Sequence, residues 1–141
     1  MVPLKHETAY ECAKEVKKAY YRDLGEEPLM SRHAPVVQSR MALSNALDSR
    51  IPYYVIGELL GVDRTTALHY RRTHENNLEH WEGYREKYIT ACSIAAVMFE
   101  KLEKSKSLDR MHDINMKLNE LHKCIETLEK EKESIKIKFN V

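Results

Sequence analysis

The stretch from Leu78 to the C-terminus contains no proline and a single glycine, Gly83, so little in it can end a helix. Within it, hydrophobic side chains recur at alternating intervals of four and three residues, as at the a and d positions of a coiled coil. These positions are Ile114, Leu118, Leu121, Ile125, Leu128 and Ile135, with Lys132 as the one polar member. The whole chain of 141 residues has only four glycines and four prolines, too few for the turns of a sandwich or barrel. The sequence therefore predicts an all-α protein.

A second hydrophobic series precedes the first and is out of phase with it across residues 103–109. Its members are Trp81, Tyr84, Tyr88, Ala91, Ala95, Phe99 and Leu102. Two arrangements fit this change of phase. Either the helix breaks at residues 105–107 and folds back as a hairpin, or one long helix changes its contact face. Because a single amphipathic helix needs a partner, we expect residues 77–141 to form a homodimer or higher homo-oligomer, unless a hairpin covers the heptad pattern.

Shorter helical patterns fill the N-terminal half, and we expect residues 1–76 to form a separate domain. Apolar spacing predicts helices over residues 8–23, 35–49, 52–60 and 64–74. A capping-box pattern, Thr8 to Glu11, is expected to start the first helix. Gly61 is expected to end the third helix, and the Asp63 side chain to cap the fourth.

The last two of these helices predict a helix-turn-helix, a motif that places its second helix in the DNA major groove. The chain as a whole is nearly neutral, with 23 basic and 22 acidic residues, so any DNA site must be a local patch. Residues 31–74 supply one, with six arginines against three acidic residues. Arg64, Thr65 and Thr66 lie at the helix start, where side chains reach base edges, whereas Arg32, His69, Arg71 and Arg72 are expected to hold phosphates.

Several strings in this region carry a family resemblance. Ile51-Pro52 and Ile56-Gly57 precede the string Asp63-Arg64-Thr65-Thr66-Ala67-Leu68-His69, and all follow a helix with Arg40-Met41-Ala42-Leu43. This arrangement resembles the C-terminal DNA-binding domain of the bacterial replication initiator DnaA, of the Trp-repressor-like class, over about residues 8–75 and most sharply over 40–72. The resemblance implies that Asp63, Arg64, Thr65 and Thr66 read DNA, that His69 lies near the backbone, and that Ser31-Arg32-His33 enters the minor groove. The residues expected to contact DNA are thus Arg32, Arg40, Asp63, Arg64, Thr65, Thr66, His69, Arg71 and Arg72.

The sequence departs from the family at the base-reading edge. Val62 stands where the family has an arginine, Arg64 stands where it has a histidine, and the turn is one residue shorter. The family's recognition sequence is therefore not assumed for this chain. The family's ATP-binding module has no counterpart, and neither glycine-rich nucleotide motif occurs, so no nucleotide is expected.

Other function classes find little support. Cys12, Cys92 and Cys124 are odd in number and widely spaced, which predicts neither a disulfide framework nor a metal site. No nucleophile, base and orienting group occur together, so we expect no enzyme and no cofactor. No apolar run reaches the roughly 18 residues of a membrane span, and the N-terminus does not read as a secretory signal. These features predict a cytoplasmic protein, and the resemblance to a bacterial initiator domain that stands without its ATP-binding module implies a bacterial or phage-infected cell.

The predicted function is sequence-specific binding of double-stranded DNA, by a transcriptional regulator or an accessory replication factor. The alternative is a helical scaffold whose helix-turn-helix binds protein and not DNA. Near-neutral charge and a long heptad pattern fit this scaffold.

Overall fold

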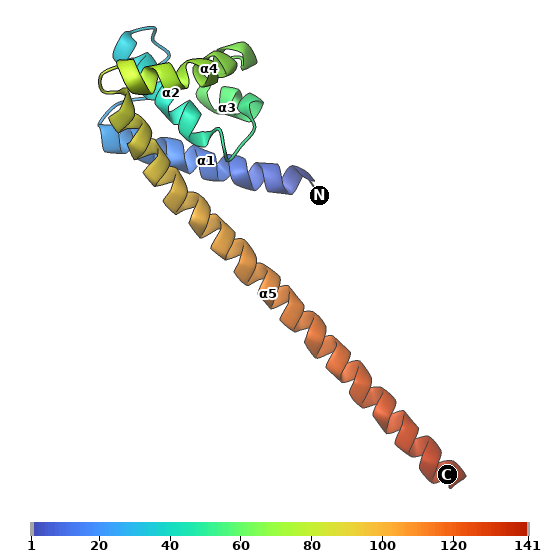
Figure 1. The fold of residues 1–141 in the computed structure, drawn as a ribbon. Coiled ribbons are helices and arrows are strands. Elements are labelled where there is room, and N and C mark those ends of the chain that lie inside the picture. The colour runs from blue at the N-terminus through green and yellow to red at the C-terminus, as the bar shows by residue number, and fades with distance from the viewer. Residues whose placement is uncertain (1, 141) are drawn as a thin grey trace. The chain divides into compact units, whose positions relative to one another are not determined.

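The computed structural model describes residues 2–140, with side chains described from residue 8, and confirms the all-α class. Over that range it has five helices and no strand (Figure 1). The helices are α1 (Val2–Leu24), α2 (Ala34–Leu47), α3 (Tyr53–Leu60), α4 (Arg64–His80) and α5 (Tyr84–Phe139).

The chain divides into two compact units, an N-terminal unit of residues 1–102 and a C-terminal unit of residues 103–141. The first unit thus extends past the boundary at residue 76 that the sequence suggested. The reason is that the first part of α5 belongs to its core, where Tyr84, Ala91, Ala95 and Phe99 are buried. Lys87 adds a polar link, because its ammonium group donates to Ser39 Oγ of α2 at 2.8 Å.

The core of the N-terminal unit is built around α2, which contacts α1, α3 and α4. From α1, Ala13, Val16 and Tyr20 lie at helical spacing and are fully buried. The Tyr20 hydroxyl donates to the Ser39 carbonyl oxygen at 2.8 Å, and burial raises the pKa of this phenol. A buried polar group is therefore satisfied where α1 crosses α2.

Two helix ends differ from the sequence predictions by six residues each, and the others by at most two. Helix α1 begins at Val2, so Thr8 lies inside the helix and the expected capping box does not start it. Helix α4 continues to His80, six residues past the predicted end at His74, and the chain then turns through residues 81–83. Gly83 makes this turn with a φ of 89°, a left-handed conformation that favours glycine.

The hairpin alternative for the C-terminal half is wrong. Helix α5 runs without a break through residues 105–107. From Tyr84 to Leu102, the members of the first hydrophobic series are buried or half-buried in the N-terminal unit, whereas every described residue from 103 onward is exposed. One long helix therefore packs on the N-terminal unit up to Leu102 and leaves the later hydrophobic series uncovered. No helix among the described residues is both long and apolar enough to cross a membrane.

Candidate nucleic-acid interface

Helices α3 and α4 form a helix-turn-helix whose turn, Gly61 to Asp63, is closed tightly. Gly61 ends α3 with a φ of 72°, and the Val62 amide donates to the Gly57 carbonyl oxygen at 2.9 Å. A Cβ atom on Gly57 would lie 2.8 Å from the Val62 carbonyl oxygen, so only glycine fits there without a shift. The Val62 side chain packs against both hydrophobic clusters of the unit. Val62 is therefore an apolar residue that anchors the turn.

Asp63 caps α4, as the sequence predicted. Its Oδ1 accepts the Thr66 amide at 2.7 Å, and this backbone hydrogen bond lowers the pKa of the carboxyl group. The carboxylate is thus engaged at the helix terminus while it remains exposed to solvent. Arg64 and Thr65 are exposed beside it, and Thr66 is half-buried. The first turn of α4 therefore presents one arginine and one threonine fully to solvent.

Tyr53 of α3 organises the arginines of this surface. Its hydroxyl accepts from Arg64 Nη2 at 2.8 Å, and the Arg64 guanidinium lies 5.5 Å from the centre of its ring. The Arg71 guanidinium lies 5.4 Å from the same ring centre. The sequence alone does not reveal this role. The signal available was its position in the first turn of α3, opposite an arginine-rich helix.

Arg71 is paired within the protein. Its Nε and Nη2 atoms donate to the Asp48 carboxylate, the shorter contact being 2.7 Å. This hydrogen-bonded ion pair raises the pKa of the guanidinium. A phosphate would have to compete with Asp48 for Arg71. Within the protein, Arg71 is paired with Asp48, the residue that caps the C-terminal end of α2.

Arg40 lies in the interior and not on the predicted DNA-facing surface. Its side chain is 7% exposed, and its Nη2 atom donates to the carbonyl oxygens of Leu29 and Ser31 at 3.0 and 2.9 Å. Its Nη1 atom donates to the Tyr70 hydroxyl at 3.3 Å. Arg40 therefore fixes the segment before α2, and with it the backbone next to Arg32. Sequence reasoning missed this role because backbone acceptors in an irregular segment leave no pattern in the sequence.

The remaining predicted residues are exposed. Arg32 lies in the segment that Arg40 fixes, and His69 and Arg72 lie on α4. Thr65, His69 and Arg72 are spaced by four and three residues, which places them on one face of the helix. The structure thus brings together a base-reading candidate and two phosphate-binding candidates on α4.

The opposite side of α4 is held by a polar network. Asn45 Nδ2 donates to the Tyr70 carbonyl oxygen at 3.0 Å and to the Tyr84 hydroxyl at 2.9 Å. Since that hydroxyl accepts from Asn45, its own proton can be donated to His74 Nδ1, 2.7 Å away. Burial lowers the pKa of His74, which favours the neutral imidazole that this bond requires. The network ties α4 to α2 and α5.

Comparison of the chain with protein-family models, with curated proteins and with solved structures found no match. The resemblance to the initiator domain therefore rests on the motif alone and stays a prediction. Among the residues described, no group of three or more histidine, cysteine, aspartate or glutamate side chains is placed to hold a metal ion.

Proposed function

We propose that the N-terminal unit binds double-stranded DNA sequence-specifically, with the start of α4 in the major groove. The observation that carries this proposal is the exposed start of α4. The loop before it, Gly61 to Asp63, packs so closely on α3 that only glycine fits at position 57 without a shift. Arg64 can pair with a guanine edge, and the Thr65 methyl group can contact a thymine methyl group. The positive end of the helix dipole favours a nearby phosphate.

Phosphate contacts come from side chains around that turn. Arg72 and His69 lie along α4, and Arg32 lies in the segment before α2. Arg71 contributes less, because Asp48 already neutralises it. Asp63 acts as the helix cap that orients the reading residues. The biological role we propose is that of a transcriptional regulator or accessory replication factor in the cytoplasm of a bacterial or phage-infected cell, without enzymatic activity.

The test is selection of bound sequences from random duplex DNA at about 0.15 M salt, where weak charge-driven binding is suppressed. We expect an enriched motif with the full chain. Arg64→Ala should lose the preference at one position of that motif. Arg22→Ala is the matched control, because it removes the same charge from an exposed position on α1.

Absence of any enriched sequence with the full chain would overturn the proposal. Retention of DNA that weakens uniformly with salt would then reflect charge alone. That outcome favours the second reading, in which the helix-turn-helix binds protein and the chain is a helical scaffold.

A further inference from the structure

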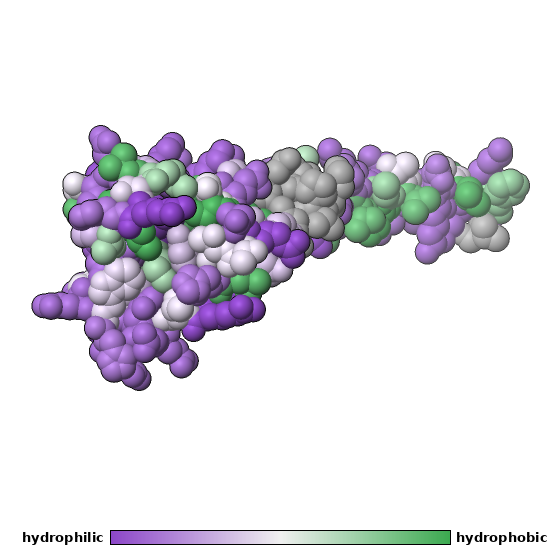
Figure 2. Space-filling model, turned by 90° about the horizontal axis from the view of Figure 1, so that it is seen from above, coloured by the Kyte–Doolittle hydropathy of each residue, from purple (hydrophilic) through white to green (hydrophobic). Residues whose placement is uncertain are grey.

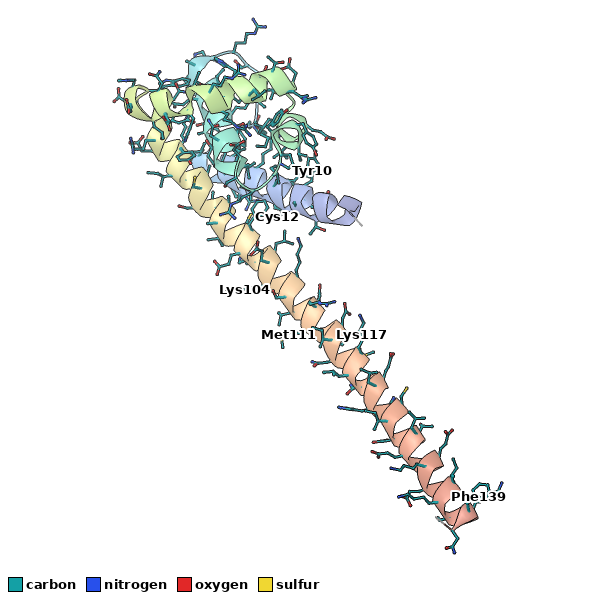
Figure 3. The ribbon with its side chains drawn as sticks, turned by 45° about the vertical axis from the view of Figure 1, so that its right-hand side comes forward. Tyr10, Cys12, Lys104, Met111, Lys117 and Phe139 are labelled. Atoms are coloured by element: carbon teal, nitrogen blue, oxygen red, sulfur yellow. The ribbon has the colours of Figure 1, made fainter. Side chains whose placement is uncertain are left out.

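The exposed part of α5 carries one continuous hydrophobic stripe, which we call the seam. Its members alternate at intervals of three and four residues: Met111, Ile114, Leu118, Leu121, Ile125, Leu128, Lys132, Ile135 and Phe139. The structure extends this pattern by one position at each end, because the helix includes both Met111 and Phe139. Figure 3 labels these two residues, and Figure 2 shows hydrophobic side chains among the charged ones along the C-terminal part of α5.

The seam lies open to solvent in the single chain. Met111 is 59% exposed, Leu128 63% and Phe139 65%. A stripe of this length and regularity marks a surface that associates. Every layer of the seam except that of Lys132 is apolar, so two copies of this surface can pack against each other.

We propose that a second copy of this chain covers the seam, with the two helices parallel and in register as a two-stranded coiled coil. With Met111 at position a, Ile125 also falls at a, between Leu121 and Leu128 at d. A β-branched residue at a with leucine at d favours two strands in a parallel arrangement. The central layers of the seam therefore favour a dimer.

Lys132 decides the register and the orientation. It also occupies an a position, so in a parallel pair in register the two copies of Lys132 share a single layer. A slip of one heptad would instead place each lysine against Ile125 or Phe139 of the other copy, which disrupts two apolar layers. In an antiparallel pair an a residue faces a d residue, so two layers are again disrupted. Only the parallel pair in register confines both charges to one layer.

Charged neighbours of Lys132 fit the same arrangement. Glu131 occupies position g and Lys136 position e of the next heptad. In a parallel pair, g of one helix lies across from the following e of the other, so Glu131 meets Lys136 of the second copy on both sides of the dimer. Glu131 also lies beside Lys132 of the second copy and offsets the repulsion within that layer. The apolar stem of Lys132 can pack in the seam while its ammonium group reaches these carboxylates.

This pairing has a consequence for DNA that rests on the proposed function. Both N-terminal units are joined to the same end of a parallel coiled coil. Two reading helices would then be available to one duplex, and the DNA site would contain two half-sites.

The test is disulfide trapping in the full-length chain, without DNA, so that it does not depend on DNA binding. In the variant Ile135→Cys with Cys124→Ser, which keeps Lys132, we expect rapid formation of a disulfide that joins position 135 of the two copies, with oxidised glutathione as the oxidant and peptide mass spectrometry to identify the product. The matched control is Lys130→Cys with Cys124→Ser, because position 130 lies on the outer face of the helix. We expect trapping at 135 to be at least about tenfold faster than at 130.

An antiparallel pair gives a different result. At a rise of about 1.5 Å per residue, its two antiparallel registers with the longest overlap of the seam separate the two copies of position 135 by at least about 25 Å along the axis. Trapping at 135 no faster than at 130 would therefore overturn the parallel arrangement. A monomeric mass of the unmodified chain by light scattering at micromolar concentration would overturn self-association altogether, whatever the chain does with DNA.

Discussion

Replacing Gly57 by alanine measures how much the closed turn before α4 matters. A Cβ atom at position 57 would meet the Val62 carbonyl oxygen at 2.8 Å, and that backbone atom cannot move without moving Asp63. Alanine is favoured over glycine inside a helix by about 1 kcal/mol. Steric overlap in a packed region costs about 1–3 kcal/mol. Because the two effects partly cancel, we expect Gly57→Ala to lower the free energy of unfolding by roughly 1 kcal/mol.

The effect on DNA should be larger than the effect on stability, since a shift of Asp63 moves the first turn of α4. We expect affinity for the selected site to fall about tenfold at a temperature where the variant is still folded. Urea unfolding followed by fluorescence of Trp81, the single tryptophan, reports on the N-terminal unit, where its ring stacks on Tyr84 with centroids 6.1 Å apart.

Gly25→Ala is the control for this experiment. It has positive φ but no heavy atom within 4 Å of the added Cβ, so it strains the backbone without a clash. It should leave DNA binding unchanged. The Gly57→Ala variant could instead be more stable than the parent and bind DNA equally well. The higher helix propensity of alanine would then be the only effect of the substitution, and the argument for a closed turn would be refuted.

Three further predictions follow from particular side chains. Arg64→Ala should relax sequence preference at one position, whereas Arg72→Ala should weaken binding to all sequences and reduce the salt slope by about one, both measured by titration at several salt concentrations; equal weakening of all sequences by both variants would contradict the division of roles. Arg40→Met should lower the free energy of unfolding by about 2–3 kcal/mol, because the carbonyl groups of Leu29 and Ser31 lose their donor; urea unfolding equal to that of the parent would contradict it. The lowered pKa of His74 means that the unfolded chain binds a proton there more readily, so stability is complete above about pH 6.5 and falls below it. Urea unfolding at about pH 7.5 and 5.5 should show this loss, and His74→Asn should reduce it; an unchanged loss in that variant would assign it to other groups.

Much of the fold could be predicted from the sequence, because amphipathic spacing and turn residues are local signals. The third helix, the Gly61 turn and the Asp63 cap were predicted where the structure has them. The extent of the N-terminal unit was not. The apolar series from Trp81 to Leu102 has the same spacing whether it packs on the chain's own core or on a partner. Only the tertiary structure shows that it packs on the core.

The candidate site was predicted less completely, because sequence supplies arginines without their partners. From the sequence alone, Arg40, Arg71 and Arg72 are all predicted to contact DNA. In the structure, Arg40 is bound to carbonyl groups in the interior, and Arg71 is bound to Asp48, 23 positions away along the chain. Such long-range partners leave no periodic pattern in the sequence. They nevertheless determine which arginine side chains are available to bind a phosphate.

This difference in partners separates the two arginines that share Tyr53. Arg71 meets a carboxylate, so its charge is already compensated within the protein. Arg64 donates to a neutral phenol, which orients the guanidinium without cancelling its charge. A side chain held in place before binding loses less conformational freedom when it docks. Under the proposed function, Tyr53 prepares Arg64 for contact with a base edge, while the same ring and Asp48 hold Arg71 within the protein.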